Sequence, residues 1–268
     1  MITGMSGERR AGALAALLVL ADGRLPAGGH AHSGGVEAAT VDGGVTSLDD
    51  LAAFLLGRLG TAGLVAASFA AAVCQACRSG NDLAAQLAAL DAELDARTPS
   101  PAQRDASRAQ GRTLLRAGRA AWDLSRLLPA GTVPAAAGKP AAGTVGAGTV
   151  GASEGSRLPL APHHPIALGV VAVAAGLEPS DAALAAVYGV VGGPASAATR
   201  LLGLDPLAVT GLQARLADAM EATAAEGASA AAAAMTAGSP ALLPAPSAVR
   251  LDLLAERHRA APVRMFTS

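Results

Sequence analysis

The apolar residues of the chain recur at helical spacing over most of its length. Two sets of side chains are separated by three and four positions: Leu51, Phe54, Leu55 and Leu59, and then Leu83, Leu87, Leu90 and Leu94. This interval places each set on one face of an α-helix. No pair of segments is convincing as β-strands, so the pattern predicts an all-α fold.

Local signals mark where two of these helices begin. Ser47 and Asp50 resemble a capping box, in which each side chain accepts a hydrogen bond from the other residue's backbone. Ser100 followed by Pro101 is typical of an N-cap and first helical position. We expect the helix after Ser47 to reach about Arg78, with a bend or close helix contacts at its glycines.

The second half of the chain carries further helical segments. They are expected at residues 164–176, 181–191, 195–204 and from Pro206 through Met220. Because the pattern on either side of the middle of the chain looks like two halves of one bundle, we predict a single-domain helical bundle over residues 1–268.

Two segments depart from this pattern. Residues 129–162 are rich in glycine and proline and almost lack charge and large apolar groups, so they cannot bury enough surface to offset their ordering entropy. We predict a long flexible loop there.

Residues 250–268 concentrate charge, arginine above all, and include Phe266. Since arginine and aromatic residues are typical interface anchors, we predict an extended C-terminal tail that binds a partner. The alternative is a frayed tail or one that folds back on its own domain.

Composition excludes some classes of function. Hydrophobic residues make up 51% of the 268 positions, charged residues 15%, and the net charge is −1. With no basic block, nucleic acid is not an expected partner.

No uncharged apolar stretch reaches the ~18 to 20 residues of a membrane span, because Arg58 interrupts the best candidate. Arg9 and Arg10 before an apolar run imitate a signal peptide, but the run continues into a glycine-rich segment, so we predict a cytoplasmic protein.

That glycine-rich segment, Leu20 to Glu37, allows three chemical interpretations. A phosphate-binding loop is disfavoured, because no strand precedes it and no Lys-Ser/Thr follows Gly35. His30 and His32 could bind nickel, zinc or copper, but two imidazoles without a third ligand make a weak site. A tight turn between two helices is the favoured interpretation.

Two other pairs could carry chemistry. Cys74 and Cys77 have the spacing of a redox pair, but their alanine-rich surroundings favour two small apolar residues on one helical face. His163 and His164 invite a metal interpretation, although adjacent residues at a helix start point in different directions.

The glycine-rich segment resembles the N-terminal signature of the UreF family of urease accessory proteins. The matching residues are Asp22, Leu25, Pro26, Gly28, Gly29, His32, Ser33, Gly35 and Glu37. Further matches follow along the chain: Gly111, Arg112, Ser196, Arg200, Leu201, Leu204, Gln213, His258, Arg264, Phe266 and Ser268. Three positions depart from the family pattern: His30 where an aromatic ring is common, Arg259 where glutamate is usual and Met265 where leucine is usual.

The resemblance implies a non-enzymatic scaffold, usually a homodimer, without a catalytic residue, a cofactor or a resident metal. Such a scaffold binds UreD (also called UreH) and recruits the GTPase UreG to urease apoprotein for GTP-dependent nickel insertion, and it has been proposed to regulate GTP hydrolysis by UreG. The alternative is a metallochaperone that carries nickel on His30, His32 and His163 or His164.

The resemblance also suggests which residues bind partners. These are His258, Arg264, Phe266 and Ser268 in the tail, with Arg112 and Arg200 on helices. We expect the tail to be disordered when free and to order on UreD, with Phe266 in a pocket of the partner. Seven residues are assigned to a structural turn or partner-facing loop: Pro26, Gly28, Gly29, His32, Ser33, Gly35 and Glu37.

Overall fold

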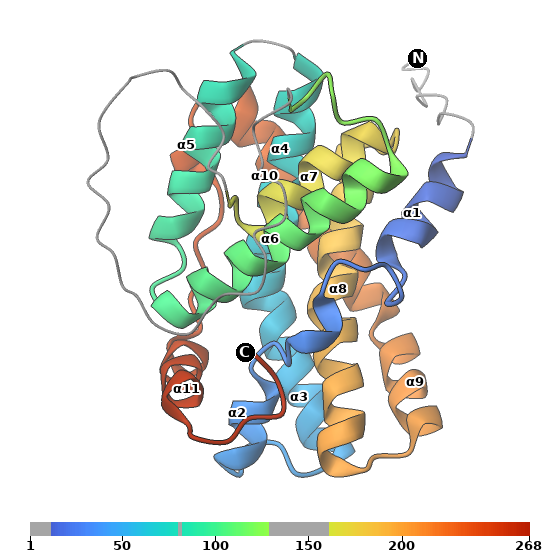
Figure 1. Cartoon of the computed structure of the whole chain (residues 1–268), viewed down its shortest axis with the longest axis vertical. Coiled ribbons are helices and arrows are strands. Elements are labelled where there is room, and N and C mark those ends of the chain that lie inside the picture. Colours follow the sequence, from blue (N-terminus) through green and yellow to red (C-terminus); the bar gives the residue numbers. More distant parts are fainter. Residues whose placement is uncertain (1–11, 80–81, 129–160) are drawn as a thin grey trace, which may run out of the picture.

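Helix α4 (Leu64–Ser79) runs through the centre of the molecule. The structure, a computed structural model, describes residues 12–79, 82–128 and 161–268. Within that part, α4 packs against α7 (His164–Ala174), α8 (Pro179–Leu202) and α10 (Ala217–Thr236), as Figure 1 shows. Most residues of α4 between Val65 and Cys77 are buried, which is expected of a helix surrounded by others.

Small residues let the neighbouring helices approach α4 closely. A Cβ atom on Gly169 of α7 would lie 2.6 Å from the carbonyl oxygen of Ala70, and one on Gly227 of α10 would lie 2.6 Å from the Cβ of Ala67. Neither position can hold a side chain without moving α4. The alanine and glycine excess of the sequence therefore sets the helix spacing of the core.

The first half of the chain follows the predicted elements closely. Ser47 and Asp50 form the expected capping box at the start of α3 (Leu48–Arg58), and Ser100 caps α6 (Pro101–Ala121). A π-helical turn, Leu59–Gly63, joins α3 to α4 at the predicted glycines. The remaining helices of this half are α1 (Ala13–Ala21), the 3₁₀ turn η1 (Gly29–Ala31), α2 (Val36–Val41) and α5 (Leu83–Ala96), which buries Leu87, Leu90 and Leu94.

Two predicted helix boundaries in the second half are wrong. The segments expected at 181–191 and 195–204 form one helix, α8, which begins at Pro179 and continues through Pro194. The helix expected through Met220 is instead two, α9 (Pro206–Arg215) and α10. It breaks at Leu216, where ψ is 0° and the amide bonds to the carbonyls of both Leu212 and Gln213. The all-α fold class is confirmed, and the described residues contain no strand.

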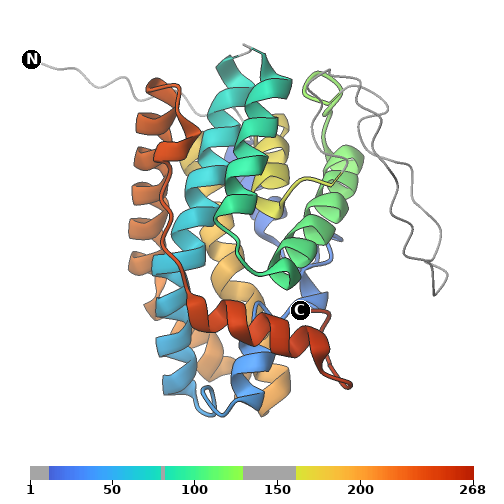
Figure 2. The same cartoon turned by 90° about the vertical axis from the view of Figure 1, so that its left-hand side faces the viewer.

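Helix α11 (Val249–Ala260) crosses the long helices of the bundle, as Figure 2 shows. The Glu256 carboxylate accepts hydrogen bonds from the Ser100 hydroxyl at 2.5 Å and the Ala102 amide at 2.8 Å. This fixes α11 to the start of α6. Before it, the short turn η3 (Pro240–Leu242) is held by Arg97, whose guanidinium donates to backbone carbonyls of residues 241, 243 and 244.

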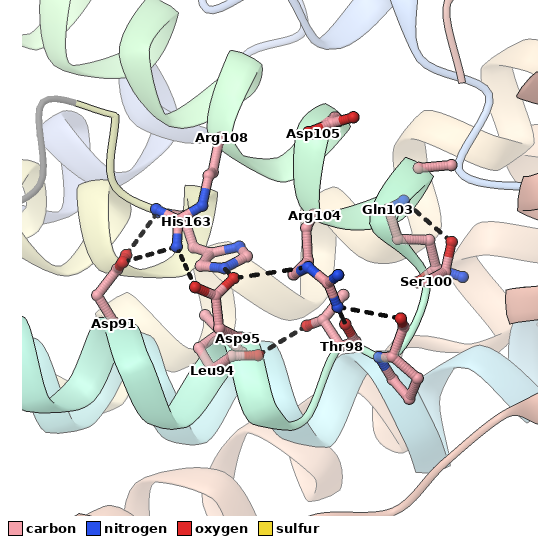
Figure 3. Close-up of polar contacts among 12 residues, drawn as sticks. Asp91, Leu94, Asp95, Thr98, Ser100, Gln103, Arg104, Asp105, Arg108 and His163 are labelled. Atoms are coloured by element: carbon pink, nitrogen blue, oxygen red, sulfur yellow. Dashed lines mark hydrogen bonds and ion pairs between the residues drawn. The ribbon is translucent and has the colours of Figure 1, made fainter. Parts of the chain in front are cut away.

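A polar network fixes the start of α7 against α5 and α6 (Figure 3). Arg108 of α6 pairs with Asp91 at 2.9 Å and with Asp95 at 2.6 Å, both on α5. His163 donates its amide to Asp91, and its Nε2 lies 2.9 Å from an Asp95 oxygen. Burial lowers the pKa of His163, although its bond to Asp95 opposes this. The network therefore uses a neutral imidazole that donates to a carboxylate.

The predicted loop at 129–162 lies almost wholly outside the described residues. By length and composition alone, two described segments could cross a membrane, Leu48–Ser79 and Pro179–Leu202. The sequence analysis did not count Leu48–Ser79 as a possible span, because Arg58 interrupts it. Both are core helices of the bundle, 67% and 56% buried over their most apolar windows, and this burial accounts for their apolar character.

Candidate functional site

The glycine-rich segment forms the loop between α1 and α2. Gly28, Gly34 and Gly35 have φ values of 79°, 62° and 90°, in the left-handed region that favours glycine. At Gly34 a Cβ atom would also lie 2.8 Å from the ring of Pro194, so the loop passes directly over α8. Gly35 then serves as the N-cap residue of α2.

The C-terminal segment, residues 261–268, lies along this loop. The Thr267 amide donates to the carbonyl of Ala31 at 2.8 Å, and the Ser33 amide donates to the carbonyl of Ser268 at 2.5 Å. The Nδ1 atom of His32 lies 2.7 Å from the Ser268 hydroxyl. Two segments from opposite ends of the sequence therefore share one hydrogen-bonded surface, which we call the loop–tail surface (residues 28–37 and 261–268).

Glu37 is the central polar residue of the loop–tail surface. Its side chain is buried and accepts three hydrogen bonds, from Nε2 of His258 at 2.7 Å, the Met265 amide at 2.7 Å and the Phe266 amide at 3.0 Å. Burial alone would raise the pKa of Glu37, but these bonds, that of Met265 foremost, bring it below its usual range. The carboxylate is therefore ionised at neutral pH and anchors both α11 and the tail.

Phe266 is part of the core, and the expectation that it stands free of the domain is wrong. Only 4% of its surface is exposed. The guanidinium of Arg200, on α8, lies 4.5 Å from the ring centroid and donates to the carbonyl of His30 at 3.2 Å. The tail packs on its own domain because Arg200 contacts the Phe266 ring and Glu37 accepts the amides of Met265 and Phe266, whereas we expected the Phe266 pocket to come from a partner protein.

The structure brings most of the sequence-predicted residues together, but not all. The loop–tail surface and its immediate contacts contain eleven of them: Gly28, Gly29, His32, Ser33, Gly35, Glu37, Arg200, His258, Arg264, Phe266 and Ser268. Arg264 is exposed on the same surface, and Arg112 is exposed on α6, one residue from Thr113, which contacts Gly28. Pro26 and Gly29 belong to the loop itself. Arg259, the departure from the family pattern, pairs with Asp105 of α6 at 3.2 Å.

A cavity of about 500 Å³ opens beneath this surface, between the loop, α6, the start of α7 and α11. His32 and His164 both line it. Burial lowers the pKa of His164 to about 4, with a further contribution from His32. His30 is exposed and does not line the cavity, while His163 belongs to the network of Figure 3. Among the described residues, no group of three or more His, Cys, Asp or Glu side chains could hold a metal ion.

Cys74 and Cys77 are buried in α4 with no disulfide between them. Burial raises the pKa of both thiols to about 12. Because the thiolate is the reactive form, these side chains are placed as small apolar core residues, as the preferred interpretation of the sequence predicted.

Sequence reasoning missed three features of the site. Glu37 was assigned to the turn, not to the tail, because no local signal connects residues so far apart in sequence. Arg58 and His164 were not connected to any cavity. The sequence offered one signal for Arg58: it is the single charge in the apolar stretch of residues 51–73, so it needs a polar environment that the sequence could not locate.

Fold and site together define an all-α protein whose glycine-rich loop is closed by its own C-terminal segment. The UreF family model matches residues 45–217. "Urease accessory protein UreF" of Mycobacterium sp. (strain JLS) is 42% identical over 255 residues, which cover 95% of this chain and 99% of that protein. The protein of the same name from Mycobacterium marinum is 46% identical, over 80% of this chain and 85% of its own length. The chain therefore belongs to the UreF family of urease accessory proteins.

Proposed function

We propose that this chain is a non-enzymatic scaffold that binds UreD (UreH) and recruits the GTPase UreG to urease apoprotein in the cytoplasm. In this role it supports GTP-dependent nickel insertion and regulates when UreG hydrolyses GTP. Family membership supports the urease context. The loop–tail surface supports the scaffold role, because it joins two segments that resemble the family motifs into one hydrogen-bonded unit.

The exposed residues of the tail give this face the composition of an interface anchor. Val263 is 87% exposed and Met265 63% exposed, and they flank the exposed Arg264, which has no partner among the described residues. Buried Phe266 holds this run in place from below. An arginine between two exposed apolar side chains on a pre-ordered backbone is typical of interface hot spots. We propose that Arg264 pairs with a carboxylate of a partner.

The experiment mixes the purified chain with UreD and UreG, with and without GTP and magnesium, and measures complex mass by light scattering. Deleting residues 264–268 is a poor test, because it also removes Phe266 from the core. The substitution Arg264→Ala avoids this problem, since its side chain supports no internal contact. We expect loss of the ternary assembly, with the mass and melting temperature of the isolated chain unchanged.

Arg116→Ala is the matched control, since Arg116 is an exposed arginine of α6 outside the loop–tail surface. It should assemble like the unaltered chain. Normal assembly of Arg264→Ala would overturn the proposed binding face. Failure of the unaltered chain to bind either partner would overturn the scaffold function itself.

We also propose that the free chain is a homodimer. Leu14 and Leu18 of α1, four residues apart on one helical face, are 58% and 73% exposed. A second copy would remove this apolar stripe from water. Leu18→Glu should give a monomer by light scattering, while Leu207→Glu, on the exposed surface of α9, should not. A dimer that survives Leu18→Glu would place the interface elsewhere.

One observation favours a second candidate function, direct nickel binding. His32 and His164, distant in sequence, line the same cavity, and neutral imidazoles are suitable nickel ligands. Calorimetric titration of nickel into the unaltered chain, His32→Ala and His30→Ala tests this. Binding that only His32→Ala weakens would support a nickel carrier. Absence of binding, or equal binding in all three proteins, would remove this candidate.

A further inference from the structure

Arg58 is a half-buried cation without a carboxylate partner. It is the last residue of α3, and its Nε donates to the carbonyl of Val190 at 3.5 Å. Its guanidinium also lies 5.9 Å from the centroid of the Phe54 ring. No described carboxylate forms an ion pair with it. A desolvated charge without a counterion is unfavourable, and burial lowers the pKa of Arg58 to about 10, which still leaves it charged at neutral pH.

The side chain lines the cavity beneath the loop–tail surface, immediately before the π-helical turn Leu59–Gly63. π-helical turns are rare in proteins, and those that occur are often found at functional sites. Here Ala62, Val65 and Ala66 follow Arg58 along that wall of the cavity. The terminal nitrogen Nη2 lies 3.4 Å from where a Cβ of Gly34 would be, so the guanidinium lies close to the glycine-rich loop.

The cavity wall carries four arginines and two carboxylates, so positive charge is in excess. Asp105 pairs with Arg259, and Arg97 pairs with Glu93. Asp252 accepts a hydrogen bond from the backbone amide of Ser100. Arg264 at the rim has no partner among the described residues. The cavity volume of about 500 Å³ lies within the range of small-molecule sites.

We propose that this cavity binds a small oxyanion, a carboxylate or a phosphate, through the guanidinium of Arg58. The planar guanidinium matches both groups with two parallel hydrogen bonds. A bound oxyanion would supply the counterion that the fold does not. The site is distinct from the partner-binding role of the exposed tail, and it stands or falls independently of the scaffold function.

Isothermal titration calorimetry of the purified full-length chain tests the proposal, with inorganic phosphate and with acetate as the two probes. Sodium chloride at matched ionic strength controls for screening. We expect saturable binding of at least one probe, and Arg58→Gln should weaken that binding by about 10- to 100-fold. Whichever probe binds more tightly identifies phosphate or carboxylate as the natural group.

Arg116→Gln, the same change at an exposed position, should bind like the unaltered chain. Arg58→Lys keeps the charge but loses the planar fork, so it should bind with intermediate affinity, and it replaces Arg58→Gln if that variant does not fold. Equal affinity in the unaltered chain and the Arg58 variants would overturn the proposal. So would the absence of saturable binding by both probes.

Discussion

The Nε2 atom of His258 lies 2.7 Å from a carboxylate oxygen of Glu37, across 221 residues of sequence, and both side chains are buried. The same carboxylate also receives the amides of Met265 and Phe266. One acidic residue of α2 therefore fixes the last helix and the segment that follows it. The loop–tail surface is a single unit because its two halves meet at this group.

Glu37→Gln should release the tail without unfolding the bundle. Glutamine keeps the size of the side chain but loses the charge, and one of its two acceptors becomes a donor facing other donors. We expect a loss of ~1 to 3 kcal/mol in local stability and faster hydrogen exchange at the Met265 and Phe266 amides. Glu221→Gln, an exposed change on α10, is the control. Unchanged exchange in the tail would contradict the anchoring role.

Phe266→Ala should destabilise the whole domain. A buried phenylalanine replaced by alanine typically costs ~3 to 5 kcal/mol, because a cavity remains. Here the change also removes the ring beneath Arg200. Chemical denaturation should show a lower midpoint with an unchanged slope. A loss below about 1 kcal/mol would mean that the tail is detached in solution, as the sequence alone suggested.

The features that sequence reasoning predicted correctly depend on neighbours. The capping box of Ser47 and Asp50 and the N-cap at Ser100 each involve residues within three positions, so short-range rules suffice. The leucine stripe of α5 likewise needs only helical periodicity. The family motifs include most residues of the loop–tail surface, but a motif marks positions and does not state what they contact.

The features that sequence reasoning missed depend on residues that are distant in sequence. Phe266 was placed outside the core because it lies close to the end of the sequence, but in the structure its ring packs against Arg200 of α8. The sequence analysis also divided α8 into two segments, 181–191 and 195–204, on either side of Pro194. In the structure the helix continues, and the proline ring faces Gly34.

The two thiols should be unreactive in the folded chain. Cys74 and Cys77 are buried, and a pKa of about 12 leaves almost no thiolate at neutral pH. Titration with a chromogenic disulfide reagent should detect no thiol in native buffer and both thiols in denaturant. Rapid reaction of either thiol in native buffer would revive the redox interpretation of this pair.

Acidification should destabilise the chain, and His164 should contribute in a defined pH window. Its folded pKa, about 4, lies below the ordinary value of 6.5, so the unfolded chain takes up a proton first. The stabilisation is complete above pH 6.5 and is lost as pH falls toward 4. From these two values its ceiling is roughly 3 kcal/mol at pH 4. Burial also lowers the pKa values of His163 and His32, although the bond of His163 to Asp95 opposes its shift, so these two groups act in the same direction.

The measurement is the free energy of unfolding by denaturant at several pH values between 7 and 4.5. His164→Gln should flatten the slope in this window, because it removes the group that protonates on unfolding. His30→Gln, at an exposed position, should leave the slope unchanged. Glu37 and Asp95, whose pKa values are lowered below those of free carboxylates, act mainly at more acidic pH and do not obscure the comparison. An identical slope in His164→Gln and the unaltered chain would show that this imidazole is solvated, and that the cavity it lines is open to water.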